Sequence, residues 1–174
     1  MTKAYVLMNC ETGSENSIIS KLKLLDNVKE VHGTFGTYDI ITKLEADAEE
    51  KIQKTISKKI RQMEKIRATL TLIAQNNGIG KRISDEEKQV LDKHMAQAYI
   101  IINCKKNHEK DVLENLGKIP EVIEDDITVG SYGIISKVAA PTYNDISDVV
   151  TKKIRRLENI RDTITLNVIE EQGH

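Results

Sequence analysis

The sequence predicts an α+β protein that contains two tandem copies of one βαββαβ unit, paired as a pseudo-dimer with sheet packed on sheet. Two observations lead to this prediction. Residues 4–73 align without gaps with residues 98–167, so that AYVLMNC falls on AYIIINC and KKIRQMEKIRATLTL falls on KKIRRLENIRDTITL. Within each copy, runs with strand periodicity alternate with runs of helical periodicity. Because structure repeats where sequence repeats, we expect a tandem domain duplication.

The first strand and the first helix of each copy follow from the spacing of apolar residues. Residues 4–10 are apolar and rich enough in strand-forming residues for a buried strand. The helix is expected at residues 14–25. Its apolar residues recur at helical spacing and share one face: Ile18, Ile19, Leu22 and Leu25.

A hairpin is predicted in each copy at a repeated sequence motif, which reads GTYDIITK at residues 36–43 and GSYGIISK at residues 130–137. In the first copy, strands at about 28–35 and 38–44 flank Gly36 and Thr37. A two-residue loop with glycine first suits a type II′ turn, because glycine adopts the required positive φ at little cost.

A second helix and a last strand complete the unit. The last strand, at residues 67–74, alternates threonine with leucine. The order strand, helix, strand, strand, helix, strand is that of the ferredoxin-like split unit. The second helix, at about 48–64, is expected to bury one apolar face: Ile52, Ile56, Ile60 and Met63.

Three segments are expected along the chain: a first domain at 1–74, a linker at 75–97 and a second domain at 98–174. The linker does not repeat, and its Asn-Asn-Gly is typical of a loop. Ser84 and Glu87 have the spacing of a capping box, so we expect one helix within the linker.

Each sheet is expected to bury both of its faces. The two helices of such a unit lie on one face, yet Tyr5 and Leu7 alternate with Ala4 and Val6, so both faces of the first strand are largely apolar. The second copy is the economical cover for the open face. This predicts an intramolecular pseudo-dimer with an approximate two-fold axis.

Composition argues against several classes of protein. Charged residues make up 30% of the chain and the net charge is −1, whereas proteins that neutralise many phosphates carry a basic excess. Apolar runs are far shorter than a membrane span. We therefore expect no direct nucleic-acid binding and no membrane binding. Cys10 and Cys104 have no metal-binding spacing, and we expect them to be buried in a reducing cytoplasm, with no metal and no cofactor.

The segments that repeat most clearly resemble one known family. AYVLMNC in the first strand, GTYDIITK across the hairpin and IRATLTL in the last strand are similar to the ligand-binding regulatory domain of the Lrp/AsnC family, also called the RAM domain. The family's transcription factors carry an N-terminal helix-turn-helix, which we do not expect here because the first strand begins near residue 4. The resemblance implies amino-acid sensing at sites between dimers, near the hairpin and the last strand.

The hairpin supplies the first half of the candidate ligand site. Asp39 lies beside Gly36, Thr37 and Tyr38, and its carboxylate is placed to accept a charge-assisted hydrogen bond from the ammonium of an amino acid. The alternative is a solvated turn residue near the surface, since aspartate beside glycine is common in turns for local reasons.

The last strand supplies the second half. Thr69 and Thr71 share one face of that strand and are candidates to bind the carboxylate of the ligand. Strand propensity alone is the alternative explanation. Tyr132 repeats Tyr38 in the second copy, but Gly133 stands where Asp39 would repeat, so the second site is expected to be altered or empty.

A basic motif, KKIR, ends the second helix of each copy at residues 58–61 and 152–155. Each of these helices begins with acidic residues, and this order is the one that the helix dipole favours. We therefore interpret the motif as dipole complementation rather than as a nucleic-acid interface.

The sequence as a whole predicts a cytoplasmic regulatory protein that binds a small molecule, with an amino acid as the expected ligand. It is expected to form homo-oligomers and to modulate transcription together with full-length Lrp/AsnC regulators. The alternative is a structural or interaction protein that kept the assembly and lost the ligand. No nucleophile–base pair or phosphate loop is recognisable, so the sequence predicts that the protein is not an enzyme.

Overall fold

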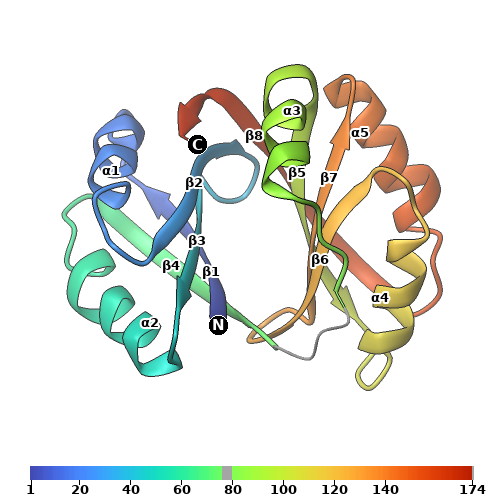
Figure 1. The fold of residues 1–174 in the computed structure, drawn as a ribbon, viewed down its shortest axis with the longest axis horizontal. Coiled ribbons are helices and arrows are strands. Elements are labelled where there is room, and N and C mark those ends of the chain that lie inside the picture. The colour runs from blue at the N-terminus through green and yellow to red at the C-terminus, as the bar shows by residue number, and fades with distance from the viewer. Residues whose placement is uncertain (76–79, 174) are drawn as a thin grey trace. The chain divides into compact units, whose positions relative to one another are not determined.

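The computed structural model describes residues 1–75 and 80–173 (Figure 1). Contacts between residues divide the chain into two compact units, Met1–Asn76 with Ile169–His174, and Asn77–Val168. The repeated elements of each copy form a four-stranded antiparallel sheet with two helices. The prediction of tandem ferredoxin-like units is therefore confirmed, and the packing of sheet on sheet stays a prediction.

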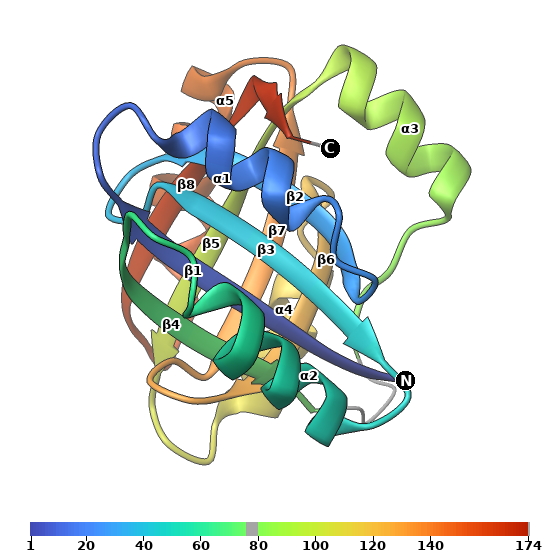
Figure 2. The same ribbon diagram turned by 90° about the vertical axis from the view of Figure 1, so that its left-hand side faces the viewer.

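The first unit has the predicted order of elements: β1 (Thr2–Cys10), α1 (Glu15–Leu22), β2 (Val28–Phe35), β3 (Ile40–Ala46), α2 (Glu49–Thr55), the π-helix η1 (Ile56–Ile60) and β4 (Ile66–Ala74). Its strands lie in the order β2-β3-β1-β4, and all three pairs are antiparallel. Helices α1 and α2 lie over one face of this sheet (Figure 2).

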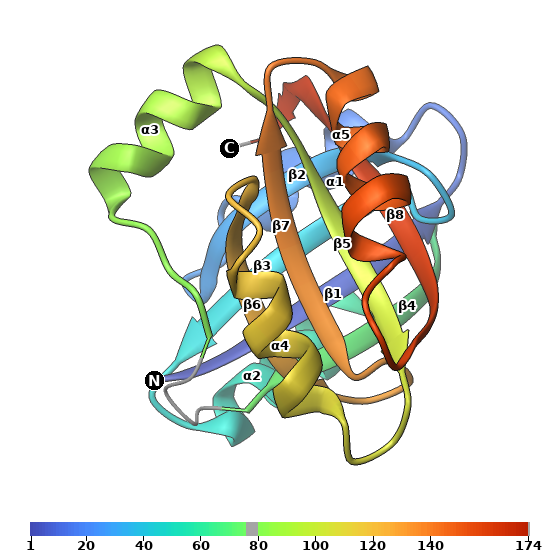
Figure 3. The same cartoon turned by 90° about the vertical axis from the view of Figure 1, so that its right-hand side faces the viewer.

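The second unit repeats this arrangement with β5 (Ala96–Cys104), α4 (Glu109–Gly117), β6 (Val122–Val129), β7 (Ile134–Ala140), α5 (Tyr143–Val149), the π-helix η2 (Val150–Ile154) and β8 (Ile160–Gly173). The strand order is β6-β7-β5-β8. Helices α4 and α5 cover one face, as Figure 3 shows. The additional helix α3 (Asp85–His94) precedes β5.

Each unit has its own core between the helices and the sheet. In the first unit Val6 and Met8 of β1 pack with Ile18 and Leu22 of α1 and with Ile52 of α2. The corresponding side chains pack together in the second unit. The apolar spacing that predicted the helices therefore identifies the residues that hold them to the sheet.

The opposite face of each sheet is apolar and buried too, as the alternation in the first strand predicts. Tyr5 is 2% exposed, and Leu7 and Leu72 are fully buried. A repeated lysine also lies buried among these side chains. Lys43 Nζ is 3.5 Å from Glu30 Oε2, and Lys137 Nζ lies 5.2 Å from the centre of the Tyr99 ring. The sequence analysis did not anticipate these buried charges.

Residues 80–83, here called the strap, lead into α3 and are bonded to the second unit. Lys81 N donates to Asp125 Oδ1 at 2.6 Å, and Asp125 N donates to Lys81 O at 3.2 Å. The strap thus pairs with β6, the outermost of the four strands of the second unit. Gly80 is required there, because a Cβ atom at this position would meet Asp125 O at 2.2 Å.

Ser84 caps α3 as the capping-box spacing predicts, since its side chain accepts a hydrogen bond from Glu87 N. The second helix of each copy differs from prediction in its last turn, which is π-helical. Arg61 N donates to Ile56 O at 2.8 Å, and Arg155 N donates to Val150 O at 2.9 Å. Both bonds span one residue more than an α-helical bond does.

Candidate functional site

The predicted threonines lie on the helix-facing side of β4. Thr71 pairs with Val6, and Thr69 pairs with Met8, and both of these β1 residues belong to the helix-facing core. Directly paired residues of antiparallel strands point to the same face. Thr69 and Thr71 therefore share a face, as the sequence predicts, and this face is turned toward α2 and η1.

The arginine of each KKIR motif contacts the first of these threonines. Arg61 Nε donates to Thr69 Oγ1 at 3.4 Å, and in the second unit Arg155 Nε donates to Thr163 Oγ1 at 2.9 Å. The π-helical turn ends at this arginine in both units. π-Helical turns often mark functional positions, because the extra residue re-aims the side chains that follow. Dipole complementation, the prediction from sequence, leaves this contact unexplained.

In the second unit, a pocket of about 250 Å³ lies beside Thr165, the residue that corresponds to Thr71. We call it the threonine pocket. Residues of α5 and η2 form one wall, and Thr165 and Asn167 of β8 form the other. The lining residues are Tyr143, Ile146, Ser147, Val150, Thr151, Arg155, Thr165 and Asn167.

The threonine pocket combines a cation with an acceptor that lacks a partner. Asn167 Oδ1 is buried and accepts no hydrogen bond from the residues that the structure describes. At the position equivalent to Thr165, Thr71 Oγ1 of the first unit is likewise buried and without a partner among those residues. Buried polar atoms are normally hydrogen-bonded, so an orphaned acceptor in a pocket indicates a place for a donor from a ligand.

The hairpin of the first unit is longer at its tip than predicted. The prediction of a two-residue type II′ turn is wrong, because four residues, Gly36 to Asp39, connect β2 to β3. The pairing closes with Thr34 N donating to Asp39 O at 2.8 Å, while Asp39 N donates to Met8 O on β1 at 2.9 Å. The backbone of Asp39 therefore bonds to both β2 and β1. Gly36 has the expected positive φ, 147°.

Asp39 has a structural partner. Its Oδ2 accepts a hydrogen bond from Cys10 N at 3.0 Å, where β1 ends. Burial raises the pKa of the Cys10 thiol, and the charges of Asp39 and Glu15 raise the pKa further, against a hydrogen bond with Ser14 that lowers it. Cys10 is therefore a buried, protonated thiol rather than a nucleophile.

The hairpin of the second unit repeats this backbone without the carboxylate. Thr128 N donates to Gly133 O at 2.9 Å, and Gly133 N donates to Ile102 O at 3.2 Å. Tyr132 is half-buried, like Tyr38, and the carbonyls of both tyrosines accept a hydrogen bond from a threonine hydroxyl. The repeated phrase thus preserves a loop conformation in both units, and only the first unit adds a charge.

The two halves of the predicted ligand site do not meet within one unit. Asp39 adjoins β3, whereas Thr69 lies on β4, and β1 runs between these strands. Two strand spacings separate them by about 10 Å, and Thr71 lies farther along β4. The ammonium and carboxylate of one α-amino acid are attached to the same carbon and cannot span that distance. Gly36, Thr37 and Tyr38 belong to the same hairpin as Asp39 and are therefore separated from Thr69 by β1 as well.

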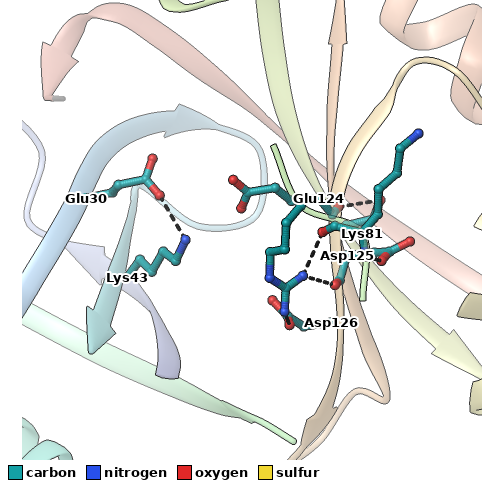
Figure 4. A network of polar contacts seen from close by, with 8 residues as sticks. Glu30, Lys43, Lys81, Glu124, Asp125 and Asp126 are labelled. Atoms are coloured by element: carbon teal, nitrogen blue, oxygen red, sulfur yellow. Dashed lines mark hydrogen bonds and ion pairs between the residues drawn. The ribbon is translucent and has the colours of Figure 1, made fainter. Parts of the chain in front are cut away.

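The strap brings together a cluster of charges that sequence reasoning missed (Figure 4). Asp125 and Asp126 are each 2% exposed, and Arg82 forms an ion pair with Asp126 and donates from Nη1 to Asp125 O at 2.6 Å. Asp125 Oδ2 is buried and has no hydrogen-bond partner among the described residues. Two adjacent aspartates in a predicted strand were the only signal of this cluster in the sequence.

Replacing Asp125 with asparagine should stabilise the second unit at neutral pH. Burial raises the pKa of the Asp125 carboxyl, and Asp126 adds to this, while the bond from Lys81 N and the charges of Arg82 and Lys81 oppose it. A raised pKa means that the folded state binds the proton more tightly, so ionised Asp125 lowers stability above the ordinary carboxyl pKa. Asparagine keeps an acceptor for Lys81 N, and we expect a gain of about 1 kcal/mol at pH 7.

Urea unfolding as a function of pH tests this expectation, because the gain should vanish near about pH 3, where wild-type Asp125 is protonated in both states. Glu121→Gln is the control with the opposite sign. A hydrogen bond from Lys153 Nζ, 2.9 Å away, lowers the pKa of Glu121, so this variant should lose up to about 1 kcal/mol at neutral pH and nothing in acid. A loss of stability at pH 7 in Asp125→Asn would contradict the assignment.

A family model described as the Lrp/AsnC ligand binding domain matches residues 3–79 and 97–172. The two matched stretches coincide with the two repeated copies and together span most of the chain. The chain belongs to the Lrp/AsnC ligand binding domain family. The resemblance found in the sequence is thereby confirmed, and membership of the Lrp/AsnC family supports a regulatory, ligand-binding role.

One curated relative of this Lrp/AsnC domain protein is an uncharacterized HTH-type transcriptional regulator from Pyrococcus furiosus. It is 33% identical over 58 residues, which are 33% of this chain and 39% of the relative. The matched part is thus about two fifths of the relative's length. The activity and partners of a whole regulator are therefore a matter of proposal for this Lrp/AsnC chain.

Solved structures that resemble most of this Lrp/AsnC chain include enzymes. The siroheme decarboxylase NirDL matches with a TM-score of 0.70 over 95% of this chain and 70% of its own, at 9% identity. A chlorite dismutase from Candidatus Nitrospira defluvii matches with a TM-score of 0.57 over 96% of this chain and 90% of its own, also at 9% identity. The prediction from sequence that the protein is not an enzyme is contradicted, because the same fold carries out catalysis elsewhere. At this identity the likeness shows the fold alone.

Two further observations concern metals and membranes. No cluster of three or more histidine, cysteine or acidic side chains suited to a metal ion is found in residues 1–75 and 80–173. Among the helices of the described part of the chain, none combines the length and the apolar character needed to cross a membrane.

Proposed function

We propose that this Lrp/AsnC domain protein is a regulatory protein that binds an amino acid in the threonine pocket of its second unit. The Arg155 guanidinium, which within the described residues donates a hydrogen bond from Nε to Thr163, is available to the ligand carboxylate through its two terminal nitrogens. Asn167 Oδ1 and the Thr165 hydroxyl are available to the ammonium. Arginine suits this role because its planar fork matches a carboxylate.

The orphaned Asn167 Oδ1 is the observation that carries the proposal. A buried amide oxygen without a donor costs stability, and a ligand that donates a hydrogen bond to it would remove that cost. The family match supports the same conclusion from a different direction. This proposal moves the candidate site from Asp39 of the first unit to the second unit, because the threonine pocket contains cation and acceptor together.

The hairpin residues Gly36, Thr37, Tyr38 and Asp39, with Tyr132 in the second unit, are proposed to complete such sites between chains. A hairpin and a threonine strand that lie apart in one unit can face one ligand when they come from different molecules. This requires a homo-oligomer, and we propose that full-length Lrp/AsnC regulators join the assembly.

The net charge of −1 supports action without direct nucleic-acid contact. The free thiols of Cys10 and Cys104 support a reducing cytoplasm.

A structural or interaction protein that has lost its ligand is the second candidate. The bond between Asp39 and Cys10 N favours this alternative, because it gives the Asp39 carboxylate a structural role. Under this alternative, no amino acid should bind to the protein.

Calorimetric titration of the purified chain with the standard amino acids distinguishes the two candidates. We expect at least one to bind, and Arg155→Met to weaken its binding roughly 10- to 100-fold, because a charge-assisted hydrogen bond is lost. Arg61→Met is the matched control, since Arg61 occupies the same position in the first unit. Absence of binding to wild type, or equal affinity of Arg155→Met, would contradict the proposal.

A further inference from the structure

Helix α3 lies over the second unit without burying any of its residues. Val90 on this helix is 59% exposed, and the strap at one end and β5 at the other hold the helix in place. Gln97 Nε2 on β5 donates to Asp92 Oδ1 at 2.8 Å. A helix that is fixed at its ends but not packed along its length leaves apolar surface uncovered.

A pocket of about 460 Å³ lies between α3, the strap and the start of β6. We call it the α3 pocket. Pockets that bind small molecules are typically about 300–1,000 Å³ and mostly apolar, with a few polar groups that fix orientation. The α3 pocket fits this description. Its apolar lining comes from three segments and includes Ile83, Val90, Leu91, Pro120 and Val122.

Lys81 supplies the positive group of the α3 pocket. Its backbone is fixed by the 2.6 Å bond from Lys81 N to Asp125 Oδ1, so the side chain starts from a rigid point. Its ammonium donates to Gly117 O and Ile119 O, both at 3.4 Å. These bonds are long compared with the roughly 2.7–2.9 Å of an ammonium bonded to a carboxylate. Lys81 forms no ion pair with any described carboxylate.

Glu87 stands at the exposed rim of the same pocket. Its Oε1 accepts a hydrogen bond from the Ser84 hydroxyl at 3.3 Å. The pocket thus presents an apolar interior, one cation with unused bonding capacity, and one solvated carboxylate at the entrance. This combination suits an aliphatic chain that ends in a carboxylate.

We propose that the α3 pocket binds a small aliphatic carboxylate, with its carboxylate at Lys81 and its chain against Val90, Leu91 and Pro120. Two kinds of molecule share this chemistry: a short branched fatty acid and an aliphatic amino acid, whose ammonium would meet Glu87. The site combines the segment of the chain that does not repeat, which supplies Lys81, Glu87 and Val90, with the start of β6. It shares no residue with the threonine pocket and does not depend on the proposed function.

A single tryptophan at position 90 tests the proposal directly, because the chain contains no tryptophan. Val90 is exposed enough to accept the larger side chain. Val90→Trp is titrated separately with 4-methylpentanoate and with leucine, and its fluorescence is recorded. We expect a saturable blue shift with at least one probe. Val129→Trp is the matched control, since Val129 is a valine of the same unit with 56% exposure that does not line the pocket.

Lys81 variants in the Val90→Trp background identify the charged contact. Lys81→Met should weaken binding roughly 10- to 100-fold, while Lys81→Arg, which keeps the charge, should retain most of the affinity. If leucine binds more strongly than 4-methylpentanoate and loses this advantage in Glu87→Gln, the pocket is assigned to amino acids. If 4-methylpentanoate binds as strongly as leucine or more strongly, the pocket is assigned to carboxylates without an ammonium.

Hydrogen exchange of the wild-type chain provides a readout without substitution, since a bound ligand should slow exchange of the α3 amides. The signal at position 90 should persist in Arg155→Met, which separates this site from the threonine pocket. The proposal is overturned if neither probe changes the Val90→Trp emission or α3 exchange, if Val129→Trp responds equally, or if Lys81→Met binds as tightly as the parent.

Discussion

Replacing Arg82 with alanine should lower the free energy of unfolding by roughly 2–3 kcal/mol, because it removes the cation that faces Asp126, a side chain that is 2% exposed. The loss is smaller than that for a fully buried pair, since the Arg82 side chain is 46% exposed. Two further bonds, from Arg82 Nη1 to Lys81 O and to Asp125 O, disappear with the ion pair. The strap should then loosen along β6.

Urea unfolding and hydrogen exchange of the strap measure this effect. Arg156→Ala is the matched control: Arg156 is an exposed arginine of the same unit, and its removal should change stability by less than about 0.5 kcal/mol. Arg82→Lys should recover part of the loss, because lysine keeps the charge but not the forked geometry. Equal stability of Arg82→Ala and Arg156→Ala would show that the strap does not depend on the ion pair.

Replacing Asp39 with alanine should lower the free energy of unfolding by about 1.5–2 kcal/mol, since Cys10 N loses a charged acceptor at 3.0 Å. A surface turn residue, the alternative weighed from sequence, would change stability little. The same substitution should lower the pKa of the Cys10 thiol, because the Asp39 charge is one of the causes that raise it. Alkylation of Cys10 should therefore reach half its maximal rate at a lower pH.

Cys104 is the internal control for this measurement. Burial and the charge of Glu109 raise the pKa of its thiol, and neither changes when Asp39 is replaced. Asp47→Ala is the control for stability, because Asp47 is an exposed partner of Lys51 and its loss should leave the free energy of unfolding nearly unchanged. Asp39→Asn separates the two effects: the amide oxygen still accepts from Cys10 N, while the charge is gone. If the rate of Cys10 alkylation depends on pH in Asp39→Asn as it does in the wild type, the Asp39 charge does not raise the pKa of the Cys10 thiol.

The repeat made the order of elements predictable. A buried strand such as residues 4–10 and a helix with Ile18, Ile19 and Leu22 on one face depend on local apolar spacing, and local spacing is visible in a sequence. The gap-free alignment of two copies doubled this signal. Family membership follows from the same three segments. The shared face of Thr69 and Thr71 was predictable too, because side chains alternate along any strand.

The hairpin tip was mispredicted because its length depends on a strand that is distant in sequence. Asp39 bonds through its backbone to Met8, and the pairing of β1 with β3 therefore determines where β3 begins. Glycine at position 36 indicated a turn but could not reveal its size. The same limit applies to Asp39 itself, whose carboxylate has a partner, Cys10 N, on that other strand.

By itself, the sequence determined the two copies, their elements, the residues of each core and the family, because each of these depends on spacing within a short segment. Only the tertiary structure decided which polar groups meet. Arg155 reaches Thr163 through a π-helical turn, Asn167 Oδ1 is left without a donor, and Lys81 lies against Asp125 across a strand edge. Hydrogen bonds and ion pairs act over a few ångströms between groups that are tens of residues apart in the chain. Their partners become defined only when the backbone has closed on itself.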